Sequence, residues 1–118
     1  MVQYSTEILD TSFAALSDAT RRGVLTRLAQ ADASISALAK SFNMSLTGMK
    51  KHVSVLEQAG LVTSAKVGRV RTCRLGRRGL ETELAWIEEH RRLWSARFDG
   101  LEDIVEELRL KEKADAPE

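Results

Sequence analysis

The amino-acid sequence predicts a mainly helical fold that contains one β-hairpin, with four helices before the hairpin and one or two after it. Three observations predict this fold class. Apolar residues recur at helical spacing up to about residue 58, alternate at β spacing over 61–75, and return to helical spacing after residue 76. The only proline, Pro117, interrupts none of these segments. The 118 residues support one hydrophobic core, so we expect a single domain over residues 1–118.

The first half of the chain predicts four helices. The first covers 6–16, the second ends near Gln30, the third is short and follows Ser34, and the fourth covers 46–58. Side-chain oxygens suited to capping precede the last three helices, at Ser17 or Asp18, Ser34 and Ser45. The apolar faces expected to form the core are Ile8, Leu9, Phe13 and Leu16; Val24, Leu25 and Leu28; Ile35, Leu38 and Ala39; and Met49, Val53 and Leu56.

A β-hairpin is predicted after the fourth helix. Two β-prone runs cover 61–67 and 69–75, and Gly68 between them supplies the turn. Residues 42–44 predict a tight turn before the fourth helix, and Gly60 is suited to end that helix. Helix, turn, helix and hairpin in this order indicate a winged helix-turn-helix, in which the second helix of the pair lies in the major groove of DNA.

The C-terminal third predicts helix again, over residues 77–113. We expect Asp99-Gly100 to interrupt this helix, with a continuous helix as the alternative, and residues 114–118 to fray. Its apolar face contains Leu80, Leu84, Ile87, Trp94 and Phe98, and Leu101, Ile104, Val105 and Leu108 continue it.

The net charge of +1 conceals an uneven distribution. Residues 21–80 carry twelve basic and two acidic side chains, a net charge of +10. Residues 1–20 have a net charge of −3 and residues 81–118 a net charge of −6. A basic centre indicates a surface for a polyanion, and a solvated mosaic of charges is the alternative.

The predicted fourth helix carries groups suited to contacting DNA. At 100° per residue, the face opposite the apolar one presents Thr47, Lys51, Ser54 and Gln58, and no acid. Hydroxyl, amide and ammonium groups hydrogen-bond base edges and phosphates. Three further cations cluster near the predicted hairpin tip, within reach of the minor groove or of flanking phosphates: Lys66, Arg69 and Arg71.

Four stretches of the chain resemble the ArsR/SmtB family of bacterial winged-helix repressors: Leu16-Ser17-Asp18-Ala19-Thr20-Arg21-Arg22, Ile35-Ser36-Ala37-Leu38-Ala39, the segment 44–62 ending in Ala59-Gly60-Leu61-Val62, and Gly68-Arg69-Val70-Arg71. The resemblance covers about residues 13–75. It implies a homodimeric repressor that binds a palindromic operator in double-stranded DNA.

The resemblance also assigns positions in the recognition helix. Lys50 stands where the family often has serine, which suggests an extra phosphate contact. His52 matches a frequent histidine but lies beside the buried face, so orienting the helix and reading bases are both open. The positions that fall where the family's recognition helix meets DNA are Ser45, Thr47, Gly48, Lys50, Lys51, His52 and Ser54.

The two terminal segments, 1–16 and 77–113, are expected to mediate dimerisation, because 17–75 already forms a complete DNA-binding core. The last segment is too apolar for one exposed helix. The alternatives are that this last segment packs only on its own domain, or that it lines a ligand pocket. The residues expected at the dimer interface are Phe13, Trp86, Trp94, Phe98, Leu101 and Val105.

Several family members sense metals, either through cysteines in the brace helix or through histidines and carboxylates on the last helix. The brace segment 35–40 has no cysteine, and His90 is the only histidine near Glu83, Glu88 and Glu89. We therefore expect no metal site. No cofactor and no enzymatic activity are expected either, because phosphate-loop and catalytic-triad patterns are absent from the sequence. The inducer, if any, stays open.

Composition excludes other classes of protein. The sequence has no apolar run near the length of a membrane span and no secretion signal. With one cysteine, Cys73, an intramolecular disulfide is impossible, which fits the cytoplasm. A packed thiol is expected at Cys73, with a redox sensor as the alternative. The leading function is a sequence-specific transcriptional regulator. The alternatives are a protein-interaction module and a non-specific architectural DNA-binding protein.

Overall fold

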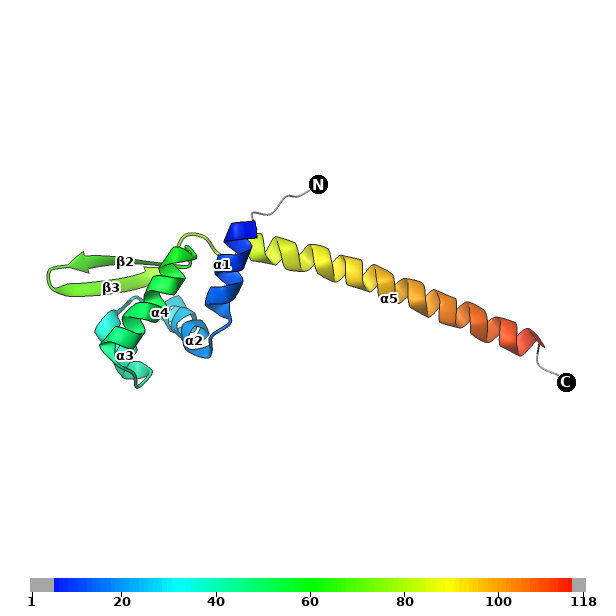
Figure 1. The fold of residues 1–118 in the computed structure, drawn as a ribbon, viewed down its shortest axis with the longest axis horizontal. Coiled ribbons are helices and arrows are strands. Elements are labelled where there is room, and N and C mark those ends of the chain that lie inside the picture. Colours follow the sequence, from blue (N-terminus) through cyan, green and yellow to red (C-terminus); the bar gives the residue numbers. More distant parts are fainter. Residues whose placement is uncertain (1–5, 116–118) are drawn as a thin grey trace. The chain divides into compact units, whose positions relative to one another are not determined.

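The computed structural model describes residues 6–115. The elements are α1 (Thr6–Leu16), α2 (Ala19–Gln30), β1 (Ala33–Ser34), α3 (Ile35–Ser41), α4 (Leu46–Gln58), β2 (Val62–Val67), β3 (Val70–Leu75) and α5 (Glu81–Asp115) (Figure 1). They form two compact units, one ending at Glu83 and one starting at Leu84. The predicted fold class, mainly helical with a β-hairpin wing, is confirmed.

Three helices begin at the predicted capping residues. The side chains of Asp18, Ser34 and Ser45 each accept a hydrogen bond of 3.0 Å from the backbone N–H three residues later. Ser17, the other candidate for α2, instead donates its hydroxyl to the carbonyl of Ala14. Each such cap stabilises its helix by about 1 kcal/mol. The starts of α2, α3 and α4 are therefore fixed by local chemistry.

The recognition helix candidate α4 ends in a left-handed residue, as predicted. Gly60 has φ = 74°, a conformation that costs glycine nothing. The N–H of Gly60 donates to the carbonyl of Glu57, and the N–H of Leu61 donates to that of Leu56. This pair of bonds is a Schellman motif, which satisfies the carbonyls at the helix end and directs the chain into β2.

The sheet has three antiparallel strands in the order β1-β3-β2. Gly68 (φ = 64°) is the first of two turn residues between the paired Val67 and Val70, which suits a type II′ hairpin turn. Strand β1 was not expected: Ala33 pairs with Cys73, so the short segment before α3 completes the sheet.

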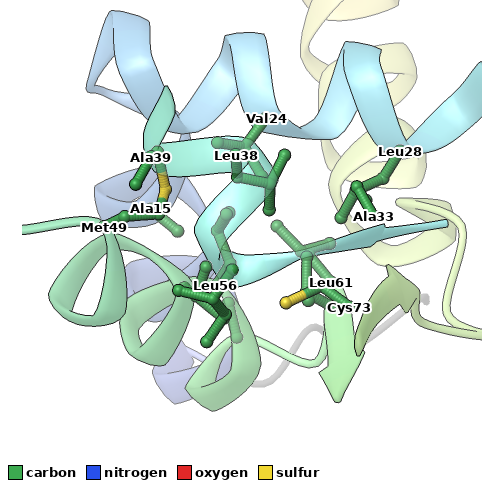
Figure 2. Packing of buried hydrophobic residues seen from close by; sticks show 14 residues of the cluster. Ala15, Val24, Leu28, Ala33, Leu38, Ala39, Met49, Leu56, Leu61 and Cys73 are labelled. Atoms are coloured by element: carbon green, nitrogen blue, oxygen red, sulfur yellow. The ribbon is translucent and has the colours of Figure 1, made fainter. Parts of the chain in front are cut away.

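The core lies between the end of α1, α2, α3, α4 and the sheet (Figure 2). Leu38, Met49 and Leu56 are fully buried at its centre. The predicted apolar faces of α3 and α4 are confirmed as buried, and in α2 Val24 and Leu28 are buried. Such packing fixes α4 with one face inward and the other outward.

The buried face of α1 differs from the expected one. Leu9, Ser12 and Ala15 are buried, whereas Ile8 is exposed and Phe13 is half-buried. The expected stripe did not include Ser12 or Ala15. The buried hydroxyl of Ser12 is satisfied by a hydrogen bond that it accepts from Arg78, a partner far away in the sequence.

Helix α5 is continuous over 35 residues, so the expected interruption at Asp99-Gly100 is wrong. A single glycine costs a helix interior only about 1 kcal/mol relative to alanine, too little to end it. The helix includes residues 114 and 115 of the segment expected to fray, while 116–118 lie outside the described residues. No helix within 6–115 combines the length and apolarity needed to cross a membrane.

Candidate nucleic-acid interface

Helix α4 presents a mostly polar face to solvent, on which Glu57 is the one acid. Thr47, Lys50, Lys51, Ser54 and Gln58 are all exposed, and the opposite side of the helix is buried in the core. These five side chains therefore supply two hydroxyls, two ammonium groups and one amide on a helix whose orientation is fixed by packing. These groups hydrogen-bond base edges and phosphates.

Two of the predicted DNA-contacting residues also build the start of α4. The hydroxyl oxygen of Ser45 accepts a hydrogen bond from the N–H of Gly48 at 3.0 Å. A Cβ at Gly48 would lie 3.1 Å from that hydroxyl oxygen and 3.2 Å from the terminal methyl of Met44. Both distances are tight, so glycine at position 48 protects the cap as well as permitting close approach of a ligand to the backbone.

His52 is half-buried and bonded to α2. Its Nδ1 lies 3.2 Å from Nη1 of Arg21 and 3.8 Å from Oδ2 of Asp18. Because a guanidinium only donates, Nδ1 accepts and the proton of the neutral ring is on Nε2. The backbone N–H of Arg21 lowers the pKa of Asp18 by hydrogen bonding to it, with smaller contributions from nearby charges. These contacts support the interpretation that His52 orients α4.

Arg21 extends this link to α1. Its Nε donates to the carbonyl of Ala15 at 2.8 Å, and its Nη2 donates to the carbonyl of Ala14 at 3.0 Å. One guanidinium thus satisfies carbonyls at the C-terminal end of α1 while contacting the middle of α4.

The hairpin cations and Lys50 are brought together. Lys66 and Arg71 face each other across the hairpin, and both are exposed, as is Arg69. A hollow of about 460 Å³ separates the hairpin from the starts of α3 and α4. It has four cations and no carboxylate in its lining, which consists of Ser34, Ile35, Ser36, Leu46, Lys50, Lys66, Arg69, Val70 and Arg71. This arrangement suits a polyanion.

Glu57, the only acid of α4, is bonded towards the hairpin. The hydroxyl of Ser64 donates to Oε1 of Glu57 at 2.7 Å and accepts from Nη1 of Arg71 at 2.8 Å. Sequence reasoning missed this connection, because the role of Ser64 depends on the packing of β2 beside α4. The two hydrogen bonds connect the end of α4 to both hairpin strands and hold the Glu57 carboxylate towards the hairpin.

Cys73 lies on β3 and is fully buried. Burial raises the pKa of its thiol, and Glu57 acts in the same direction, against a smaller opposing effect of Arg71. A protonated, buried thiol is a poor nucleophile, which supports a packing role.

Residues 6–115 contain no group of three or more histidine, cysteine, aspartate or glutamate side chains that is placed to hold a metal ion. His90 is engaged within α5: its Nδ1 lies 2.9 Å from the carbonyl oxygen of Trp86, and its ring stacks on the indole at 3.9 Å.

A row of large apolar side chains on α5 is exposed. Trp94 is 67% exposed, Phe98 62% and Val105 56%, and Leu101 is also exposed. Their positions, continued by Leu108, alternate in steps of four and three residues, the spacing of a coiled-coil seam. The other two residues predicted at a dimer interface, Phe13 and Trp86, are half-buried.

Comparison with known proteins identifies the class. Residues 16–65 match the model of a helix-turn-helix domain. The uncharacterized helix-turn-helix-type transcriptional regulator YuzN of Bacillus subtilis is 38% identical in an 88-residue alignment that covers 67% of this chain and 95% of YuzN.

Two solved structures extend the match. The ArsR-family transcriptional regulator RHA00566 is 43% identical, with a TM-score of 0.73 over 80% of this chain and 97% of its own. An ArsR-like regulator from Rhodococcus sp. RHA1 is 37% identical, with a TM-score of 0.75, and the match covers 86% of this chain and 93% of that regulator.

The fold and these relatives define a transcriptional regulator with a helix-turn-helix DNA-binding domain. Its relatives are regulators and not enzymes. The chain belongs to the ArsR family, as the sequence resemblance predicted.

Proposed function

We propose that the protein is a homodimeric repressor that binds a palindromic operator. In this proposal, helix α4 enters the major groove and the hairpin reaches the adjacent phosphates or minor groove. The part of the chain over 17–75 binds DNA, and 1–16 and 77–113 mediate dimerisation. His52 is proposed to orient α4. The residues proposed to contact DNA are Ser45, Thr47, Gly48, Lys50, Lys51, Ser54, Lys66, Arg69 and Arg71.

One observation carries the DNA-binding proposal: the exposed face of α4 offers hydroxyl, amide and ammonium groups with one acid, Glu57, at its edge towards the hairpin, and it adjoins a hollow lined by four cations. The winged-helix alternative of a protein-interaction module would favour acids or large apolar residues on this face. Thr47, Lys51 and Ser54 offer hydrogen bonds instead.

The homodimer is supported by the exposed row on α5. A single helix with Trp94, Phe98 and Leu101 in water leaves apolar area uncovered. Packing against the same row of a second copy covers it with a two-fold symmetric contact. Two copies then present two recognition helices to half-sites about 34 Å apart.

We also propose that operator binding does not respond to metals. The sequence has only two histidines and one cysteine. Each already has a partner or a packed environment: His52 contacts Arg21, His90 contacts Trp86, and Cys73 is buried in the core. A zinc site needs about four ligands in tetrahedral arrangement.

The test is selection of bound DNA from a pool of random double-stranded oligonucleotides by the full-length protein. A palindromic consensus, bound at least about 10³-fold more tightly than random DNA, supports the proposal. Bound DNA without a consensus would indicate a non-specific architectural protein, and no bound DNA would support a protein-interaction module. A transcription assay with the site placed over a promoter then distinguishes repression from activation.

A further inference from the structure

Arg78, in the loop between β3 and α5, contacts three other segments of the fold. Its Nη1 donates to Oε1 of Glu83, in the first turn of α5. Its Nη2 donates to the hydroxyl oxygen of Ser12 in α1 at 2.6 Å and to the carbonyl oxygen of Ala59, the C-cap of α4, at 2.8 Å.

The geometry requires a guanidinium at this position. The acceptors lie on different elements, and a planar group with several fixed N–H directions serves them simultaneously. Glu83 is 2% exposed, and its second oxygen, Oε2, has no hydrogen-bond partner among the described residues. Arg78 is therefore the charge that keeps this buried carboxylate in place.

A second arginine bridges the same two helices elsewhere. Arg21 joins the carbonyls of Ala14 and Ala15 in α1 to His52 in the middle of α4. Arg78 joins Ser12 in α1 to the end of α4. Core packing fixes which face of α4 is inward, and the two attachments to α1 further restrict small changes in the tilt of the helix.

We propose that Arg78 is a positioning residue that fixes the C-terminal end of α4 to α1 and so sets the placement of the recognition helix relative to the dimer axis. The inference rests on the proposed function, in which α4 reads a half-site and α1 belongs to the dimerisation segment. Phe13 of that segment directly follows Ser12. Arg78 thereby determines which half-site spacing the dimer accepts.

Loss of the Arg78 attachment would change the populations of the positions that α4 occupies. With both attachments in place, nearly all molecules hold α4 at the spacing that the operator requires. Removing one attachment lets α4 sample other positions, and the apparent affinity falls in proportion to the fraction that stays competent. Operators with altered spacing then become better ligands relative to the original.

The experiment uses Arg78→Lys, which keeps the charge but cannot serve all three acceptors, and three operators: the selected one and versions with one base pair added or removed between half-sites. One base pair shifts a half-site by about 3.4 Å and rotates it by about 35°. Arg77→Lys is the matched control, because Arg77 is the exposed neighbour of Arg78. Affinities are measured at a temperature where thermal melting shows each variant to be folded.

We expect Arg78→Lys to bind the selected operator about tenfold more weakly, equivalent to one charge-assisted hydrogen bond, and to lose most of the wild-type preference for its spacing. Arg77→Lys should keep that preference. Equal weakening on all three operators, or wild-type binding by Arg78→Lys, would overturn the inference. If Arg78→Lys does not fold, Ser12→Ala removes one acceptor and should shift the spacing preference in the same direction; an unchanged preference then overturns it. Failure of the wild-type protein to bind any duplex counts against the proposed function instead.

Discussion

Nη1 of Arg21 lies 3.2 Å from Nδ1 of His52, and this contact joins the first turn of α2 to the middle of α4. The histidine is therefore held against the helical core, although it stands among residues predicted to contact DNA. The relationship separates two groups of residues on one helix: those that face solvent and those that hold the helix in place.

The first prediction concerns His52→Ala. Removing the acceptor for Arg21 should lower the free energy of unfolding by about 1–2 kcal/mol and weaken operator binding indirectly. Because His52 is not expected to contact phosphates, the dependence of affinity on salt should keep its slope. Urea denaturation and operator titration at several salt concentrations measure both effects. A reduced slope with unchanged stability would show that His52 contacts DNA.

The second prediction concerns Lys50, which lines the hollow together with the hairpin cations. Lys50→Ser should weaken binding to all duplexes by a similar factor. It should also reduce the slope of log affinity against log salt by about 1 for each phosphate that the variant no longer neutralises. The preference among operator sequences should stay the same. If Lys50→Ser weakened binding only to operators that carry a particular base at one position, Lys50 would instead be a base-reading residue.

The third prediction concerns Trp94→Ala. Trp94 is 67% exposed in the protomer, so its truncation should leave the protomer intact. If Trp94 is buried between two copies, the effect appears as dissociation at low protein concentration. Sedimentation at decreasing concentration measures it. A Trp94→Ala protein that stays dimeric at nanomolar concentration would place the dimer interface elsewhere.

The fourth prediction concerns the pH dependence of stability. The hydrogen bond from Arg78 lowers the pKa of Glu83, against the opposing effect of burial. A carboxyl whose folded pKa is depressed contributes stability above its unfolded pKa, about 4.3, and loses it as pH falls towards the folded value. The difference in unfolding free energy between wild type and Glu83→Gln should therefore shrink from pH 7 to pH 3. A difference that is constant over this range contradicts the assignment.

Much of the DNA-binding fold was predictable because its signals are local. The caps at Asp18, Ser34 and Ser45 and the inward face of α4 follow from neighbouring residues within one or two turns. Strand β1 could not be predicted, because two residues acquire strand geometry only by pairing with β3. The interruption expected at Gly100 gave too much weight to one glycine in a helix without proline.

The exposed residues of the candidate site were also predictable from helical periodicity, but their connections were not. The bonds of Ser12 with Arg78 and of Ser64 with Glu57 join segments whose proximity depends on the tertiary fold. A serine on a helix or strand has the same sequence signature whether it faces solvent or a buried guanidinium. Sequence alone therefore predicted which residues of α4 are exposed, and the structure revealed how the helix is held.

The most direct test of DNA recognition by α4 is a titration of the selected operator with wild type and Lys51→Ala between 50 and 200 mM salt. If a dimer neutralises about six to ten phosphates, wild-type affinity should fall about 10³–10⁵-fold over this range. Lys51→Ala should bind more weakly throughout, while its unfolding free energy changes by less than about 0.5 kcal/mol, because Lys51 is exposed. A flat salt response, or wild-type affinity in Lys51→Ala, would contradict the account.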